Sequence, residues 1–429
     1  MIKKFLTLAL AAACITAGNA FAGSSLLDGI AAPEIRSELA VPAASRVTEE
    51  SRYQRDTTWT IMVYVNAKNN LEEYGLKDIN EMEAFGSTEK VKVVAELGRM
   101  NGFSFAEGNW TGSRRYFIQK DNNPSAIASP VVENMPSADM GDWNHLVDFV
   151  KWAKTNYPSR NYMLIVWNHG SGWVKRTGEK GISYDDETGN HITTVQLGKA
   201  LRAMKGVDIY ASDACLMQML SVAYEIKDRT DYIVGSEETE PGDGYTYDLL
   251  LEKINASDLT ALGVGKATVD AYSDHYKSIG QSSTHSLIKT EHLQTFVSAL
   301  NAFADTVMTH YDRNMVKAAR AKTASYAYDD NKDLLDFVRN MLALDPQDSN
   351  VPEEENLENA GYYVNHMAKK VVVYNRTNTF MTGWDNKDYS TSQGLAIYLP
   401  DSGYNPSYDT LQLGKVSSWP KFIKWLNGK

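Results

Sequence analysis

The sequence predicts an α/β fold whose central sheet is mostly parallel and covered by helices on both faces. Three observations lead to this prediction. Apolar, β-rich runs alternate with amphipathic, helix-length stretches between residues 58 and 238, the order that parallel strands need because each crossover requires a long connection. The first of these runs, at 58–67, is apolar and β-rich, as in a strand buried on both faces. With 43% hydrophobic and 23% charged residues, the chain can build a full globular core.

Residues 1–22 have the features of an export signal. MIKK supplies two lysines, FLTLALAAA is a short apolar run, and AFA offers a cleavage site before Gly23. Cys14 in AAAC resembles a weak lipoprotein box, but Ala11 stands where a larger aliphatic residue is usual, so a surface lipoprotein is the lesser alternative. Either route exports the chain from a bacterial cytoplasm, and we expect a secreted or periplasmic protein. No later apolar run predicts a membrane span.

Residues 23–56 show no sustained periodicity and are interpreted as a linker or pro-segment. The core domain is expected to span residues 57–255. Its first strand is TWTIMVYVNA (58–67), which is apolar and β-rich. NNLEEYGLKDINEMEAFG (69–86) follows as an amphipathic helix that ends at a glycine, and KVKVVAEL (90–97) predicts the second strand.

The alternation continues through the next part of this core. NHLVDFVKWAKTNY (144–157) predicts a helix and NYMLIVWNHG (161–170) the third strand. TTVQLGKALRAMKG (193–206) predicts another glycine-ended helix before the fourth strand, VDIYASDA (207–214). LMQMLSVAYEIKDR predicts an apolar helix at 216–229, and DYIVGSEE predicts a fifth strand at 231–238.

Residues 256–429 are expected to form a C-terminal α+β extension that packs on the core or completes it. Helical periodicity predicts helices within 258–277, 290–321, 331–344 and 419–426, and AKKVVVYNRT predicts a strand within 368–377.

Charge narrows the range of partners. The formal net charge is −11, and loss of Lys3 and Lys4 with the export signal would make it −13. A chain this acidic is not expected to bind nucleic acid, because phosphate contacts require a basic surface. It suits a protein that attracts cationic ligands. The oligomeric state is open, with a monomer as the expectation.

Cys215 is the first candidate for chemistry. The only other cysteine, Cys14, lies within the export signal, so the mature chain would carry one cysteine. Exported proteins usually pair their cysteines or lack them. A lone cysteine can be an inert buried residue, and its neighbours must therefore decide. Here it follows the fourth predicted strand, in YASDACLMQ.

His169 is the second candidate. Sites in open α/β sheets form at the carboxyl ends of strands, and WNHGSGW ends the third strand with His169 and Gly170. If the third and fourth strands are neighbours, an imidazole and a thiol project from one edge, where the imidazole can activate the thiol and protonate a leaving amine. The expected helix at 216 would favour the thiolate through its dipole. The amides of Gly170 and Cys215 could bind an oxyanion. A histidine before a glycine is also a common polar turn residue.

Taken together, these motifs resemble the clostripain family of cysteine peptidases, in the caspase-like clan. The resemblance rests on IVWNHGSGW, DACLMQMLSVAYEIKD and DYIVGSEETEPGDGYTY, with WTIMVYVNAKNNLE and SQGLAIYLP resembling early and late family strands. It runs from about residue 57 to 400. It implies a caspase-like α/β/α sandwich and an endopeptidase, with His169 as general acid/base and Cys215 as nucleophile.

The resemblance also implies cleavage after basic residues, with arginine preferred and lysine often accepted. The matching acidic position is Asp213, where a carboxylate can meet a guanidinium in a bidentate pair. Asp243 also matches and is expected to line the same pocket, although an aspartate between two glycines is a good turn residue in its own right. The expected partners are proteins or peptides with arginine or lysine before the cleaved bond.

Family members often mature by cutting themselves between the histidine and the cysteine. The polar, glycine-containing loop at 174–191 offers Lys175, Arg176 and Lys180 for such a cut. Its DDETGN stretch faintly resembles a calcium loop, and some relatives depend on calcium, but the spacing does not fit a twelve-residue loop. The sequence requires no cofactor and shows no cluster of zinc spacing, and calcium is left as an open alternative.

Two other functions are carried beside the peptidase. The chain could keep the fold as a non-catalytic surface binding protein, although neither member of the histidine–cysteine pair is replaced. It could also be a metal-assisted hydrolase with His169 and nearby acids as ligands.

Overall fold

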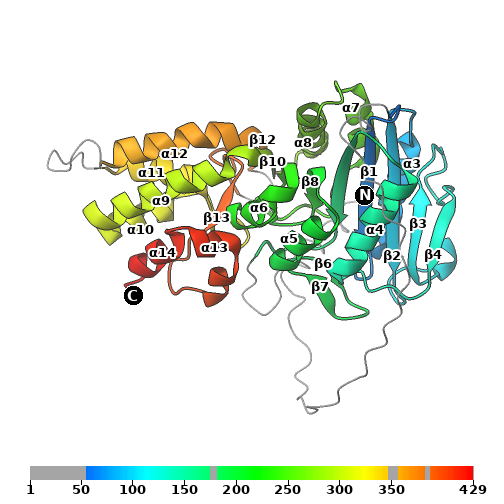
Figure 1. Ribbon diagram of the computed structural model, residues 1–429, viewed down its shortest axis with the longest axis horizontal. Coiled ribbons are helices and arrows are strands. Elements are labelled where there is room, and N and C mark those ends of the chain that lie inside the picture. Colours follow the sequence, from blue (N-terminus) through cyan, green and yellow to red (C-terminus); the bar gives the residue numbers. More distant parts are fainter. Residues whose placement is uncertain (1–54, 174–180, 346–355, 382–386, 429) are drawn as a thin grey trace, which may run out of the picture.

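A nine-stranded sheet forms the middle of the molecule (Figure 1). The computed structural model describes residues 55–173, 181–345, 356–381 and 387–428, so the predicted export signal and nearly all of the predicted linker lie outside the described residues. The strand order is β12 (Val372–Asn378), β10 (Ser283–Lys289), β9 (Thr230–Gly235), β8 (Val207–Asp213), β5 (Asn161–Trp167), β1 (Trp59–Asn66), β2 (Val91–Arg99), β3 (Gly112–Phe117) and β4 (Val131–Met135).

The centre of this sheet is parallel and its flanks are antiparallel. Strands β9, β8, β5, β1 and β2 run parallel to one another, whereas β10 and β12 on one side and β3 and β4 on the other are antiparallel to their neighbours. The predicted α/β sandwich with a mostly parallel central sheet is confirmed. All five strands predicted between residues 58 and 238 are present as its parallel strands.

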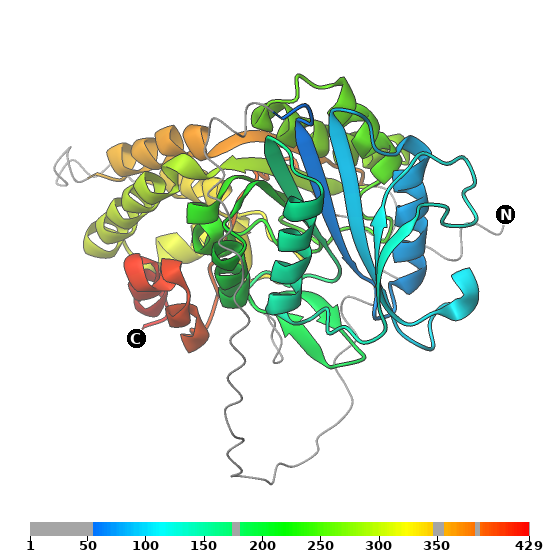
Figure 2. The same cartoon turned by 45° about the vertical axis from the view of Figure 1, so that its right-hand side comes forward.

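Helices cover both faces of the sheet (Figure 2). One face packs against α4 (Trp143–Asn156) and α5 (Thr194–Ala203), and the other packs against α3 (Glu72–Phe85), α7 (Tyr247–Ala256) and α8 (Ala261–Ser278). Strand β1 shows why its sequence is apolar throughout, because Met62 and Tyr64 belong to one buried cluster while Ile61 and Val63 belong to the other. Alternate side chains of a strand point to opposite faces.

The predicted helix at 216–229 is wrong at its start. Helix α6 spans only Leu220–Ile226, followed by the 3₁₀ turn η2 (Lys227–Arg229). Leu216 has a φ of 63°, its amide donates to Glu238 O at 3.0 Å, and the amide of Gln218 donates to Ser236 O at 2.9 Å. Residues 216–219 therefore hydrogen-bond to residues 236–238, which are distant in sequence, and they are not helical. As a result, no helix N-terminus lies directly after Cys215 to stabilise a thiolate.

The C-terminal part of the chain supplies two strands of the main sheet and a second group of helices, at the left of Figure 1. The predicted helices at 290–321, 331–344 and 419–426 are present within it. Its elements beyond β10 and β12 are η3 (Thr290–His292), α9 (Leu293–His310), α10 (Arg313–Lys322), β11 (Asn331–Asp333), α11 (Leu334–Ala343), α12 (Leu357–Val371), β13 (Ala396–Tyr398), η5 (Pro406–Thr410), α13 (Gln412–Val416) and α14 (Trp419–Leu426).

Two small features complete the fold. Strands β6 (Ile182–Asp185) and β7 (Asn190–Ile192) form a hairpin, and η1 (Glu107–Asn109) is a short 3₁₀ turn. Neither was expected from the sequence. None of the helices in the described part of the chain combines the length and the hydrophobicity needed to cross a bilayer.

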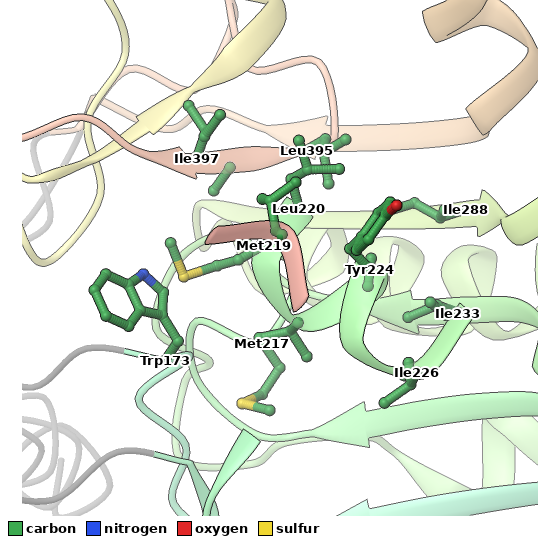
Figure 3. Close-up of a cluster of buried hydrophobic side chains, with 14 of the residues drawn as sticks. Trp173, Met217, Met219, Leu220, Tyr224, Ile226, Ile233, Ile288, Leu395 and Ile397 are labelled. Atoms are coloured by element: carbon green, nitrogen blue, oxygen red, sulfur yellow. The ribbon is translucent and has the colours of Figure 1, made fainter. Parts of the chain in front are cut away.

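One hydrophobic cluster joins the sheet to the C-terminal helices. Figure 3 shows Trp173 beside Met219, with Leu220 next to Leu395 and Ile397 of the strand β13 region. The amide of Ala396 donates to Gln218 O at 3.0 Å, and Met219 and Ala396 form a parallel bridge. The chain that follows Cys215 is therefore held from both sides, by residues 236–238 and by β13.

A pair of buried acids lies at this junction. Glu237 and Asp333 are 1% and 0% exposed. Oε2 of Glu237 accepts from the amide of Gly394 at 3.2 Å, and Oδ2 of Asp333 accepts from the amide of Gln393 at 2.5 Å. Burial, reinforced by the charge of Asp333, raises the pKa of Glu237 well above its usual value, and burial raises the pKa of Asp333 to about 6. The folded protein therefore keeps protons that the unfolded chain releases near pH 4.

These two acids should make the protein less stable as pH rises. As pH rises from about 4, where the unfolded carboxyls ionise, through about 6, the free energy of unfolding should fall, and the raised pKa of Asp333 alone should account for roughly 3 kcal/mol of this fall. Glu237→Gln should remove the part of the fall that Glu237 adds and should raise stability at neutral pH. Urea unfolding at pH 4.5, 5.5 and 7.0 measures it, with Glu291→Gln, an exposed acid paired with Lys289, as the control. Equal pH slopes for wild type and both variants would contradict this account.

Candidate active site

Strands β5 and β8 are direct neighbours, which satisfies the condition set by the sequence. They pair in parallel register with Trp167 opposite Asp213, the last residue of each strand. The amide of Asn168 continues the ladder by donating to Asp213 O at 3.2 Å. His169 and Cys215 each lie two residues beyond this last pair. The structure therefore brings both residues to the same edge of the sheet.

Gly170 brings the two loops into backbone contact. A Cβ atom built on Gly170 would lie 2.4 Å from the carbonyl oxygen of Cys215 and 3.1 Å from its amide nitrogen. Real Cβ atoms do not approach a backbone oxygen this closely, so the position has room only for glycine. The backbones on either side of the histidine and the cysteine thus pack directly against each other. The proposed oxyanion donors, the amides of Gly170 and Cys215, belong to these two touching segments.

His169 is oriented by a residue from a third strand end. Its Nε2 lies 2.7 Å from Oδ1 of Asn70, which follows β1. An amide oxygen only accepts, so Nε2 carries the hydrogen and Nδ1 of the neutral ring keeps its lone pair for a proton. The partly buried imidazole is thereby held in one orientation by Asn70.

Asn168 fixes the backbone from which His169 projects. Its side-chain amide donates to Asn66 O at the end of β1 and to Tyr184 O of β6, 3.1 Å away in the second case. Its Oδ1 accepts from the amide of Tyr184 at 2.9 Å. Moving this buried side chain would break three hydrogen bonds, which is costly. Asn168 therefore fixes the end of β5 relative to β1 and β6.

Cys215 is a buried thiol, 6% exposed. The amide of Glu240 donates to its Sγ at 3.4 Å. An N–H donor aimed at sulfur stabilises negative charge there, as other charge-assisted bonds do. This donor comes from the loop after β9 and takes the place of the helix terminus expected from the sequence.

Asp213 lies beneath the cysteine and is 4% exposed. Its Oδ1 accepts from the amide of Tyr245 at 3.1 Å and its Oδ2 from the hydroxyl of Tyr247 at 2.8 Å. Burial raises the pKa of Asp213 to about 6, against the hydrogen bonds it accepts. A buried carboxyl group whose pKa lies close to neutral pH can lose its proton when a cation binds beside it.

Asp243 is directed elsewhere. Its side chain is 43% exposed, with Oδ1 at 3.1 Å from Nζ of Lys77 and Oδ2 at 3.9 Å from Nε2 of His275. Lys77 also lies 3.1 Å from Glu81. Gly244, the next residue along the chain, lies against the carboxylate of Asp213. The loop that carries Asp243 therefore packs against Asp213, but the Asp243 carboxylate itself is paired with a lysine.

The other site predictions have different outcomes. Lys175, Arg176 and Lys180 lie outside the described residues. In the DDETGN stretch, Asp185 and Glu187 both form ion pairs with the ammonium of buried Lys68, so a protein cation already occupies that position. Across the described ranges, no group of three or more His, Cys, Asp or Glu side chains has the arrangement of a metal site. Calcium binding stays a prediction.

Sequence reasoning missed Asn70 and Glu240. Asn70 follows the first strand, so the strand-end rule applied to His169 and Cys215 would have included it. Glu240 lies in the acidic run Glu237, Glu238 and Glu240, a pattern more typical of a solvated loop, but both of its carboxylate oxygens are buried. No local pattern predicts this burial, because it depends on residues far away in the sequence.

Comparisons with known proteins point to one family. The model of the clostripain family (peptidase family C11) matches residues 63–427. Clostripain from Hathewaya histolytica is 29% identical over 248 residues, which cover 49% of this chain and 45% of that protein. The chain therefore matches less than half the length of this relative.

Two solved structures share the fold. A secreted C11 cysteine protease from Bacteroides thetaiotaomicron, in complex with an irreversible peptide inhibitor, is 18% identical with a TM-score of 0.63, over 86% of this chain and 97% of that one. An inactive zymogen C11 protease from Parabacteroides distasonis is 18% identical with a TM-score of 0.62, over 84% and 98%.

Asn70 should act as a positioning residue for the imidazole. Asn70→Ala should lower kcat about tenfold, because the ring loses the bond that sets its tautomer, while KM changes little. The pH profile of Cys215 alkylation by iodoacetamide should also shift, which a merely structural defect would not cause. Asn156→Ala, on the exposed end of α4, is the matched control. An unchanged kcat and alkylation profile in Asn70→Ala would remove this role.

Proposed function

The chain belongs to the clostripain family, and from that premise we propose that it is an exported cysteine endopeptidase that cleaves peptide bonds after arginine or lysine. The observation that carries the proposal is the close packing of Gly170 on Cys215, which holds a histidine and a cysteine at adjacent strand ends above a buried aspartate. An inert buried cysteine would need neither the adjacent imidazole nor the glycine contact.

The reaction follows from these groups. Nδ1 of His169 takes the thiol proton, and Sγ of Cys215 bonds to the carbonyl carbon of the substrate. The amides of Gly170 and Cys215 bind the oxyanion. When the C–N bond breaks, His169 gives its proton to the leaving amine and a thioester remains. Water then attacks the thioester while His169 takes one of its protons, and the released product is a carboxylic acid with the thiol restored.

Asp213 supports selection of a cationic side chain before the cleaved bond. It lies two residues from the nucleophile, is buried, and has no cation in its own hydrogen bonds, which come from Tyr245 and Tyr247. A guanidinium would gain a charge-assisted pair there, whereas a neutral side chain would leave the carboxyl unsatisfied. The arginine or lysine preference is carried from the family resemblance.

Maturation and export belong to the same proposal. The P. distasonis relative is described as an inactive zymogen and the B. thetaiotaomicron relative as secreted. We infer the same for this chain, with removal of residues 1–22 and a cut in the 174–191 loop after Lys175, Arg176 or Lys180. The expected substrates are proteins or peptides, acted on by a monomer.

Fluorogenic peptides ending in Arg, Lys, Ala or Asp test the reaction. Wild type should cleave after Arg or Lys at least 100-fold faster than after Ala or Asp, because only a cation satisfies the buried carboxyl. Cys215→Ala and His169→Ala should both abolish cleavage. Circular dichroism of each variant controls for folding. A folded, fully processed wild type that cleaves none of the four peptides would favour the binding-protein alternative.

Self-processing is tested by intact mass and N-terminal sequencing. Wild type should show a new N-terminus within 174–191, whereas Cys215→Ala should stay whole because the cut needs its own nucleophile. Addition of active wild type to Cys215→Ala separates cleavage in cis from cleavage in trans. A wild-type chain that remains intact while active would eliminate the cut.

A further inference from the structure

Glu240 contacts both Cys215, through its backbone amide, and the buried acid Asp213, through its side chain. Its backbone amide donates to Sγ of Cys215 at 3.4 Å, while both of its carboxylate oxygens are buried without a hydrogen-bond donor among the described residues. Burying a carboxyl group without partners is expensive. A buried carboxyl group beside the cysteine that accepts from no N–H group among the described residues is suited to a cationic partner.

The carboxyl group of Glu240 interacts with that of Asp213 through its charge and through a side-chain hydrogen bond. Two ionised carboxylates are both acceptors, so they can bond to each other only by sharing a proton. Burial, then the charge of Asp213, raises the pKa of Glu240 well above its usual value, and Asp213 itself has a pKa of about 6. The empty pair therefore holds a proton under mildly acid conditions, in the manner of other carboxylate dyads.

The surroundings of this pair are acidic and aromatic. Two further buried oxygens next to it have no hydrogen-bond partner in the described part of the chain, the hydroxyl of Tyr272 and Oδ1 of Asp78, whose residues are 2% and 1% exposed. The titratable groups that act on Asp213 or Glu240, or are acted on by them, are Asp78 and Glu81 of α3, Tyr245 and Tyr247, and Tyr272 and Tyr276 of α8.

Lys77, the nearby lysine, does not neutralise the charge of the Asp213 and Glu240 carboxyl groups. Lys77 is 44% exposed, and its ammonium lies 3.1 Å from both Glu81 and Asp243. Asp243 is thus already paired with a cation, whereas Glu240 is not. Of the acids in this loop, Glu240 is therefore better placed than Asp243 to meet an incoming positive charge.

We propose that Glu240 and Asp213 together form the cation-binding site for the substrate side chain before the cleaved bond, and that they share a proton which this side chain displaces to solvent. The assignment rests on the proposed function and makes Glu240 a specificity residue. No bond of the pair other than that to the shared proton breaks. An arginine or lysine supplies the charge that replaces the proton, whereas a neutral side chain of the same shape leaves the proton in place.

The first experiment replaces Glu240 with glutamine, which has nearly the same shape but does not titrate. Glu240→Gln is compared with wild type on matched peptides ending in arginine or in citrulline, its uncharged isostere. The ratio of kcat/KM for arginine over citrulline should fall at least tenfold in Glu240→Gln, because one of two charged partners is lost. Glu291→Gln removes one exposed acid from the surface and should keep the wild-type ratio. An unchanged ratio in Glu240→Gln overturns the proposal.

The second experiment follows the proton. KM for the arginine peptide should fall as pH rises from 5.5 to 7.5 in wild type, because the pair must lose its proton to accept the cation, and KM for the citrulline peptide should stay flat. Glu240→Gln should flatten the arginine profile. A pH dependence that survives in Glu240→Gln assigns the proton to another group and overturns the shared-proton part.

A binding measurement separates this inference from the peptidase itself. Isothermal titration of Cys215→Ala with benzamidine at pH 6, in two buffers of different ionisation enthalpy, measures protons released on binding. About one proton should leave per benzamidine bound, and clearly less in Cys215→Ala carrying Glu240→Gln. No binding, or equal release in both, overturns the inference even if wild type cleaves after arginine. Proton release without cleavage by wild type would sustain the inference and overturn the peptidase proposal.

Discussion

The backbone contact between Gly170 and Cys215 is the constraint on which the site depends. It exists because β5 and β8 are parallel neighbours in register to their last residues, and because residue 170 has no side chain to separate the loops. Asn168 then ties the first loop to β1 and β6, while segment 216–219 is held by residues 236–238 and β13. The backbone segments that carry the histidine and the cysteine are therefore fixed against each other.

The second organising feature is a set of acids kept inside. Asp213, Glu237 and Asp333 are all less than 5% exposed, and burial raises the pKa of each. Such groups lower stability at neutral pH because the unfolded chain ionises more readily. These acids lie in two places with different partners. Asp213, two residues before Cys215, accepts from the amide of Tyr245 and the hydroxyl of Tyr247, whereas Glu237 and Asp333 at the junction with β13 accept from the backbone amides of residues 394 and 393.

Much of this could be predicted from the sequence, and the failures have physical causes. Continuous apolar runs marked the five parallel strands, and strand ends marked His169 and Cys215, because burial on both faces and the edge of a parallel sheet leave local patterns. The helix start at 216 was wrong because the amides of Leu216 and Gln218 bond to Glu238 and Ser236, which no local window contains. Strands β3 and β4 were missed because sequences such as GSRRYF are short and charged. The roles of Asn70 and Glu240 depend on contacts with loops distant in sequence.

The bridge from Met219 to Ala396 also sets when the site can exist. Residue 396 is synthesised long after Cys215, and the strand that contains it must pair with Met219 before segment 216–219 has both of its supports. A chain synthesised only as far as Cys215 would carry this cysteine without the backbone contacts that hold the segment after it. The arrangement of residues around Cys215 is therefore complete only after residue 396 has been made and has paired.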